Sequence, residues 1–113
     1  MSTPDHNPHL SKDEFQRYGY ALVDWLAEYF ENLEGHNVLP SISPGDIRSM
    51  LPINAPETPD SMEEIIGDLD EIVMPGMAHW QHPGWYAFFP SGVSPVSVLG
   101  EFVSAGLATQ GMM

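Results

Sequence analysis

The chain has 113 residues, enough for one domain with a modest hydrophobic core. Sixteen acidic residues against three basic ones give a formal net charge of −13, which argues against binding to nucleic acids or to anionic membranes. The sequence has no cysteine, which excludes disulfides and thiolate metal sites. It shows no secretory signal and no apolar run of the roughly 20 residues that a membrane span needs, so we expect a cytoplasmic location.

The first predicted element is an amphipathic helix over residues 11–34. It follows a polar tail at residues 1–10, which we expect to be disordered. Ser11 and Glu14 have the spacing of a capping box, and Gly35 is a typical helix stop. Apolar side chains recur every three or four residues and should share one stripe of this helix: Phe15, Tyr18, Leu22, Trp25, Leu26, Tyr29 and Leu33.

Two shorter helices are predicted in the middle of the chain, joined by extended, proline-containing connectors. Ser43 and the proline after it predict a short helix with a serine N-cap and proline at its first position, ending near residues 51–52. Ser61 and Glu64 form a second capping box, which opens a helix that ends at residues 75–76.

The last predicted element is a buried helix over residues 96–108, apolar nearly all round and entered through Ser94. From residue 93 to the end of the chain Glu101 is the only charged residue. Exposed apolar runs of this kind favour association, so we expect the chain to be the N-terminal piece of a longer protein. The fold class predicted from these elements is a mainly α-helical fragment.

The most informative stretch is residues 75–95, where four prolines exclude a continuous helix and leave an extended aromatic segment at residues 85–89. Aromatic rings on extended backbone either pack into a core or line a pocket for a planar ligand. Trp80, Phe88 and Phe89 with Pro90 form a candidate slot, and Ser91 would place a hydroxyl at its rim. Composition leaves both interpretations open, with core packing the commoner use of such rings.

Other candidate sites in the sequence have simpler explanations. His79 and His82 form an HxxH pair, but the proline that follows and the lack of a third ligand argue against zinc. We expect one of these histidines to be packed and the other to be bonded to backbone. The acidic residues 63–71 lack a calcium-binding loop and predict a solvated helix face. Lys12, beside acids in a surface helix, has no feature of a nucleophile, so no catalytic residue and no metal site is predicted.

Residues 79–83 (HWQHP) followed by residues 86–91 (YAFFPS) resemble the N-terminal region of the aromatic-L-amino-acid decarboxylases, which are pyridoxal-phosphate enzymes of the group II decarboxylase family. The similarity covers about residues 14–113. It implies the aspartate-aminotransferase fold (type I) in an intertwined homodimer. The chain would then comprise the disordered tail, a helical dimerisation segment at residues 11–90, and the start of the large cofactor-binding domain at residues 91–113.

The resemblance also implies which residues bind the substrate: Trp80, Phe88, Phe89, Pro90, Ser91, Gln110 and Met112. The last two would belong to a loop that reaches the partner subunit's active site. Family members more often carry tyrosine at the position of Phe88 and a larger residue at that of Met112, which leaves the preferred substrate open.

The implied reaction is the decarboxylation of tryptophan, phenylalanine, tyrosine or dopa to an amine and carbon dioxide, with pyridoxal phosphate as the electron sink. The family's cofactor-binding lysine and its other cofactor contacts have no counterpart in these 113 residues. The fragment would therefore supply dimer surface and pocket wall without being catalytic. The alternatives are a free-standing helical protein-interaction module and, last, a small HxxH metal-binding domain.

Overall fold

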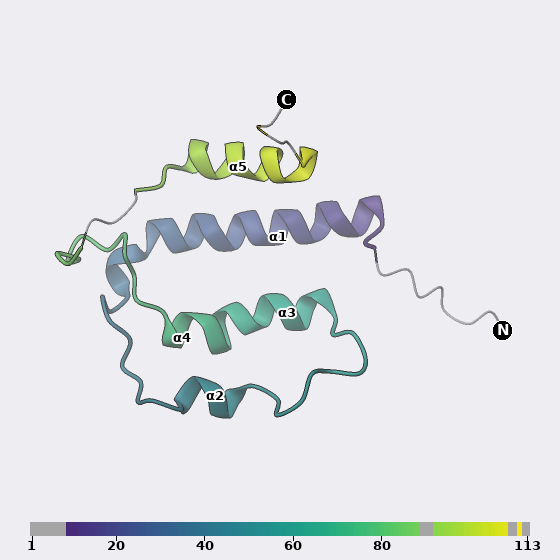
Figure 1. Ribbon diagram of the computed structural model, residues 1–113. Coiled ribbons are helices and arrows are strands. Elements are labelled where there is room, and N and C mark those ends of the chain that lie inside the picture. Colours follow the sequence, from purple (N-terminus) through teal and green to yellow (C-terminus); the bar gives the residue numbers. More distant parts are fainter. Residues whose placement is uncertain (1–8, 89–91, 109–110, 112–113) are drawn as a thin grey trace.

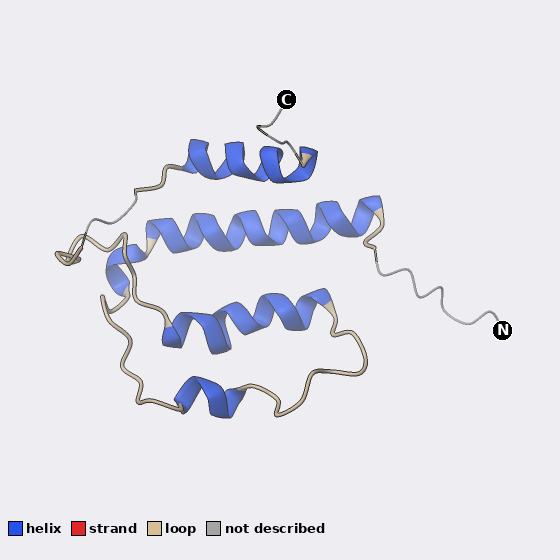
Figure 2. Ribbon diagram, in the orientation of Figure 1, coloured by secondary structure: helices blue, strands red, loops and turns tan. Residues whose placement is uncertain are grey.

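The computed structural model describes residues 9–88, 92–108 and 111 (Figure 1). Within these residues the chain forms helices and no strand, so the prediction of a mainly helical fragment is confirmed (Figure 2). Most of the predicted tail lies outside the described residues. So do five of the predicted substrate-binding residues, namely Phe89, Pro90, Ser91, Gln110 and Met112.

The longest element is helix α1 (Lys12–Glu31), and the predicted capping box begins it. The Ser11 hydroxyl oxygen accepts the Glu14 N–H at 3.2 Å, and the Glu14 carboxylate accepts the Ser11 N–H at 3.3 Å. A short 3₁₀ turn, η1 (Leu33–Gly35), follows Asn32, so only the last turn differs from the predicted helix. Among the described helices none is both long and apolar enough to cross a membrane.

Helix α2 (Asp46–Met50) is present, but the predicted serine cap is wrong. Gly45 precedes the helix with φ 93°, a left-handed conformation that glycine adopts without strain. The Asp46 N–H donates to the carbonyl oxygen of Ser43 at 3.1 Å, and the Asp46 carboxylate accepts the Ser43 N–H at 2.8 Å. Residues 43–46 therefore form a turn that the aspartate closes, and the proline stays outside the helix.

The third predicted helix is divided into α3 (Met62–Asp68), the π-helical segment η2 (Leu69–Val73) and α4 (Met74–Gly76). Its capping box at Ser61 and its end at Gly76 are as predicted, whereas the π-helical segment was not. At Gly76 an added Cβ would lie 2.8 Å from the Cδ1 atom of Ile47. Gly76 of α4 therefore lies close against the Ile47 side chain of α2.

Helix α5 (Pro95–Leu107) begins at the predicted Ser94, whose side chain accepts the Ser97 N–H at 3.2 Å. The prediction that this helix is buried is wrong for this chain: Val96 is 79% exposed and Leu107 is 70% exposed. The reason is that α5 lies along one side of α1 only, where Phe102 stacks on Phe15.

Helix α1 lies between α5 on one side and the α3–α4 segment on the other, with α2 outermost (Figure 1). Its predicted apolar stripe is shared between these two neighbours. Tyr18, Trp25 and Tyr29, here called the aromatic row, bond to residues of the α3–α4 segment and the loop beyond it. Phe15 and Leu26 contact the α5 side instead.

The core of the chain is small. Among the described residues only Tyr18, Tyr29 and His79 are buried. The radius of gyration is 17.6 Å, against about 13 Å for a compact domain of this length. The accessible surface is 9812 Å², whereas a compact monomer of this mass has roughly 6,200 Å². The helices thus present far more surface than a self-contained domain does.

Candidate functional site

The most buried polar contact joins the aromatic row to the loop after α4. The Tyr29 hydroxyl lies 2.8 Å from Nδ1 of His79, whose side chain is only 3% exposed. The His79 N–H donates to the carbonyl oxygen of Val38 at 2.9 Å. His79 is therefore held both by its side chain and by its backbone.

Burial fixes the protonation states at this contact. It raises the pKa of Tyr29, so the hydroxyl keeps its proton at neutral pH and can donate it. Burial is also the main cause that lowers the pKa of His79 below 6.5, helped by repulsion from His36 and His82. A neutral imidazole carries its proton on one of its two ring nitrogens. The pair is therefore a hydrogen bond between two neutral side chains.

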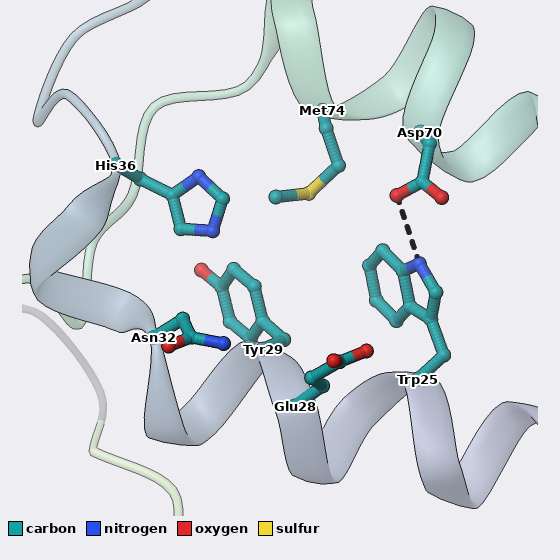
Figure 3. A pocket seen from close by; sticks show the side chains of 7 residues that line it. All are labelled: Trp25, Glu28, Tyr29, Asn32, His36, Asp70 and Met74. Atoms are coloured by element: carbon teal, nitrogen blue, oxygen red, sulfur yellow. Dashed lines mark hydrogen bonds between the residues drawn. The ribbon is translucent and has the colours of Figure 1, made fainter.

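An open pocket of about 210 Å³ lies beside this pair. Figure 3 shows its lining side chains: Trp25, Glu28, Tyr29, Asn32, His36, Asp70 and Met74. The Trp25 indole N–H donates to the Asp70 carboxylate at 3.0 Å, and its ring is parallel to that of Tyr29 with centroids 5.9 Å apart. The Tyr29 ring also lies against His36, at 5.6 Å between centroids. Aromatic walls with two carboxylates give the pocket a mixed apolar and acidic character.

Residues 79–88, which begin at His79, are here called the aromatic loop. Two successive turns shape its first half: the His82 N–H donates to the His79 carbonyl at 3.0 Å, and the Trp85 N–H donates to the His82 carbonyl at 2.9 Å. The predicted extended segment is therefore wrong in part, since Phe88 adopts φ 59°. The prolines exclude a helix as predicted, and turns replace it.

Trp80 and Phe88 are the two predicted substrate-binding residues that the structure describes, and it brings them together. Their ring centroids lie 6.0 Å apart, and Trp80 also stacks on Trp85 at 4.9 Å. Trp80 is 46% exposed and Phe88 79% exposed, so the stack forms a ring surface outside the core. The indole N–H of Trp85 is buried and has no hydrogen-bond partner within the described part of the chain.

The two histidines of the HxxH pair have the roles that the sequence analysis expected. His79 is packed in the core, and Nδ1 of His82 accepts the Gly84 N–H at 2.8 Å. Within the described ranges no group of three or more histidine, cysteine, aspartate or glutamate side chains is arranged to hold a metal ion.

Two of the three basic residues of the chain, Lys12 and Arg17, lie on α1. Lys12 is exposed in the first turn of α1, beside Asp13. Arg17 is hydrogen-bonded to its neighbour Tyr18 in α1, donating to the Tyr18 hydroxyl at 2.8 Å. That hydroxyl in turn donates to the Glu63 carboxylate of α3 at 2.8 Å. The hydrogen bond from Tyr18 is the main cause that lowers the pKa of Glu63.

The sequence predicts that Tyr29 lies on the inner stripe and that one of His79 and His82 is packed, but it does not pair Tyr29 with His79. The partners are 50 residues apart, and neither residue carries a local motif that points to the other. The involvement of His36, whose ring stacks on His79 at 4.8 Å, was also missed. The available signal was the concentration of aromatic residues on α1 and of histidines in residues 36–82.

Comparison with known proteins gives the family. Residues 44–113 match the pyridoxal-dependent decarboxylase conserved domain. L-tyrosine/L-DOPA decarboxylase 2 of Lophophora williamsii is 43% identical over 105 residues, or 93% of this chain and 20% of that protein. Phenylacetaldehyde synthase of Petunia hybrida is 41% identical over 102 residues, or 90% of this chain and 20% of that protein.

Comparison with solved structures points to the same family. The crystal structure of Catharanthus roseus tryptophan decarboxylase in complex with L-tryptophan superimposes with a TM-score of 0.83 at 35% identity, over 99% of this chain and 23% of that one. The chain thus spans about a fifth of the length of the curated relatives it matches. It belongs to the pyridoxal-dependent decarboxylase family, and the resemblance seen in its sequence is confirmed.

Proposed function

We propose that this chain is the N-terminal part of a pyridoxal-phosphate-dependent enzyme that decarboxylates aromatic L-amino acids, namely tryptophan, phenylalanine, tyrosine or dopa, to amines. Membership of the family supports the reaction class. The observation that carries the substrate class is the exposed stack of Trp80 on Phe88, because exposed rings of this kind favour contact with another aromatic ring.

The role proposed for the aromatic loop is to form one wall of the substrate pocket. Trp80 and Phe88 present ring faces that no other described side chain covers fully. The other proposed contacts lie outside the described residues and come from the family resemblance: Phe89, Pro90, Ser91, Gln110 and Met112. These residues bind and orient the substrate side chain and exclude water from it, and none of them exchanges a proton in the reaction.

Pyridoxal phosphate, when bound, supplies the electron sink for loss of the carboxylate. We propose that the residues that hold it lie outside this chain. The support is that Lys12 is exposed beside an acidic residue and that Arg17 is engaged with Tyr18 and Glu63. A lysine that forms a covalent bond with a carbonyl cofactor needs burial or cationic neighbours, and Lys12 has neither.

We further propose a homodimer in which residues 11–90 form a dimerisation segment and residues 91–113 begin the large domain. The support is an apolar groove of about 480 Å³ between α1 and α5, lined by Val23, Leu26, Ala27, Phe30, Glu31, Pro95, Val98 and Leu99. Together with the large accessible surface, this groove fits a surface that other protein covers.

The test is to supply the whole protein that carries this chain with pyridoxal phosphate and each of the four amino acids. We expect release of carbon dioxide and the matching amine from at least one of them. Because a relative is named as a phenylacetaldehyde synthase, the aldehyde should be measured in the same reactions. Carbon dioxide with aldehyde in place of amine would correct the product, and no carbon dioxide from any of the four would refute the proposal.

A further inference from the structure

We propose that Tyr29 is a positioning residue for the substrate pocket: its hydroxyl holds His79 and thereby fixes the aromatic loop that carries Trp80 and Phe88. The inference rests on the proposed function, since it concerns the same pocket. Tyr29 itself lies in α1, outside the set of residues proposed to touch the substrate.

The contacts form a continuous series from α1 to the exposed rings. The Tyr29 hydroxyl is bonded to Nδ1 of His79 at 2.8 Å, and Trp80 is the next residue in the chain. The His79 carbonyl accepts the His82 N–H and so starts the first turn of the loop. Trp80 then stacks on Phe88 at 6.0 Å. A displacement of His79 would therefore move Trp80 directly and Phe88 through the stack.

Within this series of contacts, the Tyr29 hydroxyl is the group that orients the His79 side chain. His79 is 3% exposed, so water cannot readily replace a lost partner at Nδ1. The Val38 carbonyl holds only the backbone of His79, and the rings of Tyr29 and His36 pack on the imidazole without accepting from or donating to Nδ1. Only the hydroxyl fixes the direction of the imidazole ring, and a ring without it can rotate within its packing.

Helix α1 provides a matched control. Tyr18 is as buried as Tyr29, at 8% exposed, and its hydroxyl also makes a 2.8 Å hydrogen bond. Its partners are Arg17 in α1 and Glu63 in α3, both remote in sequence from the aromatic loop. Tyr18→Phe and Tyr29→Phe therefore remove the same group from the same helix, but only Tyr29→Phe removes it from the loop.

The experiment uses the whole protein that carries this chain and measures backbone hydrogen exchange in a peptide covering residues 79–88. We expect Tyr29→Phe to speed exchange in this peptide at least about fivefold, while Tyr18→Phe leaves it unchanged. His79→Asn keeps an acceptor close to the Nδ1 position and should preserve most of the protection, whereas His79→Leu should lose it. Equal exchange in the two tyrosine variants would overturn the proposal.

The second measurement is steady-state decarboxylation. We expect Tyr29→Phe to raise the KM for the aromatic substrate about three- to tenfold with kcat changed less than about twofold, as the loss of one hydrogen bond behind the pocket wall implies. Adding Tyr29→Phe to His79→Leu should raise KM no further. A further rise in the double variant would show that Tyr29 acts independently of His79 and would contradict the inference.

The two measurements separate the two proposals. A wild-type protein that releases no carbon dioxide refutes the proposed function, and the exchange experiment still decides whether Tyr29 holds the loop. An active wild type whose Tyr29→Phe and Tyr18→Phe variants have the same KM and the same exchange refutes the inference alone.

Discussion

The two sides of α1 are built differently. On the side of the α3–α4 segment and the loop beyond it, each member of the aromatic row makes a hydrogen bond across to that side: Tyr18 with Glu63, Trp25 with Asp70 and Tyr29 with His79. On the α5 side the described contacts are apolar, as in the stack of Phe15 on Phe102 and in the groove.

The difference shows which side the chain completes by itself. The first two bonds both join residues 45 positions apart, so α1 and the α3–α4 segment run side by side in the same direction with a fixed register (Figure 1). Directed bonds at two-turn intervals specify one alignment. Apolar attraction is non-directional, so the α5 side fixes its alignment less strictly than these hydrogen bonds do.

The largest expected effect tests the α5 side. Val98→Asp places a charge in the apolar groove, and burying it unpaired in an interface costs several kcal/mol. If a second copy covers the groove, we expect the dimer of the whole protein to weaken by roughly a hundredfold or more in sedimentation experiments. Gln16→Asp, which adds the same charge at an exposed position of α1, is the control. An unchanged dimer would show that the groove is not its interface.

A second prediction tests the support behind the α3–α4 side. Gly76→Ala places a methyl group 2.8 Å from the Cδ1 atom of Ile47, so either the Ile47 side chain or α4 itself must shift. We expect the free energy of unfolding to fall by about 1–3 kcal/mol, measured by denaturant titration. Ile47→Ala in the same chain should recover part of the loss, because it removes the clashing atoms. Failure of this second change to help would show that the close contact does not constrain α4.

The directed bonds themselves can be tested at Trp25. Trp25→Phe keeps an aromatic ring but removes the indole N–H that donates to Asp70. A hydrogen bond to a charged group contributes about 1.5–3 kcal/mol, and the partial exposure of this one puts the expected loss near the lower limit. Denaturant midpoints of the variant and the wild type measure it. Tyr20→Phe, at an exposed tyrosine of α1, is the control.

The smallest expected effect is a dependence of stability on pH. The pKa of His79 is lowered in the folded protein, so the unfolded chain binds more protons at this residue below pH 6.5. The stabilisation is therefore fully present above about pH 6.5 and is lost as the pH falls toward the folded-state pKa. His36, His82 and the Tyr29 hydroxyl are the titratable groups around it. Thermal unfolding of His79→Asn and wild type across pH 5–8 should show a steeper decline in the wild type.

The helices could be predicted because the signals are local. Ser11 with Glu14, Ser61 with Glu64, and Ser94 each start a helix where the sequence indicated. The exception is Ser43, where the choice between a capped helix and a turn depended on the backbone of Gly45 and on the Asp46 carboxylate.

Burial and pairing were harder to predict because they depend on the neighbours of each element. An apolar helix such as α5 is buried only where something covers it, and within the described residues only one side is covered. The pairs of the aromatic row join residues 45 or 50 positions apart, and no spacing rule within one helix indicates them. Of the site, Trp80 and Phe88 were candidates both from the aromatic composition of their segment and from the family resemblance, whereas the bond of Tyr29 to His79 emerged only from the structure.

The π-helical segment η2 sets the rotation about the helix axis, and so the direction in which the chain leaves the α3–α4 segment. Such a segment accommodates one residue more than an α-helix does, and each residue of an α-helix turns the chain by about 100°. Deleting a single residue between Leu69 and Val73 would therefore let the segment return to α-helical winding and keep Met74 close to its present phase, whereas the same deletion in α3 would rotate Met74 and everything after it by roughly that angle. The orientation of the rings at the end of the loop therefore depends on how the helix is wound several residues before the loop begins.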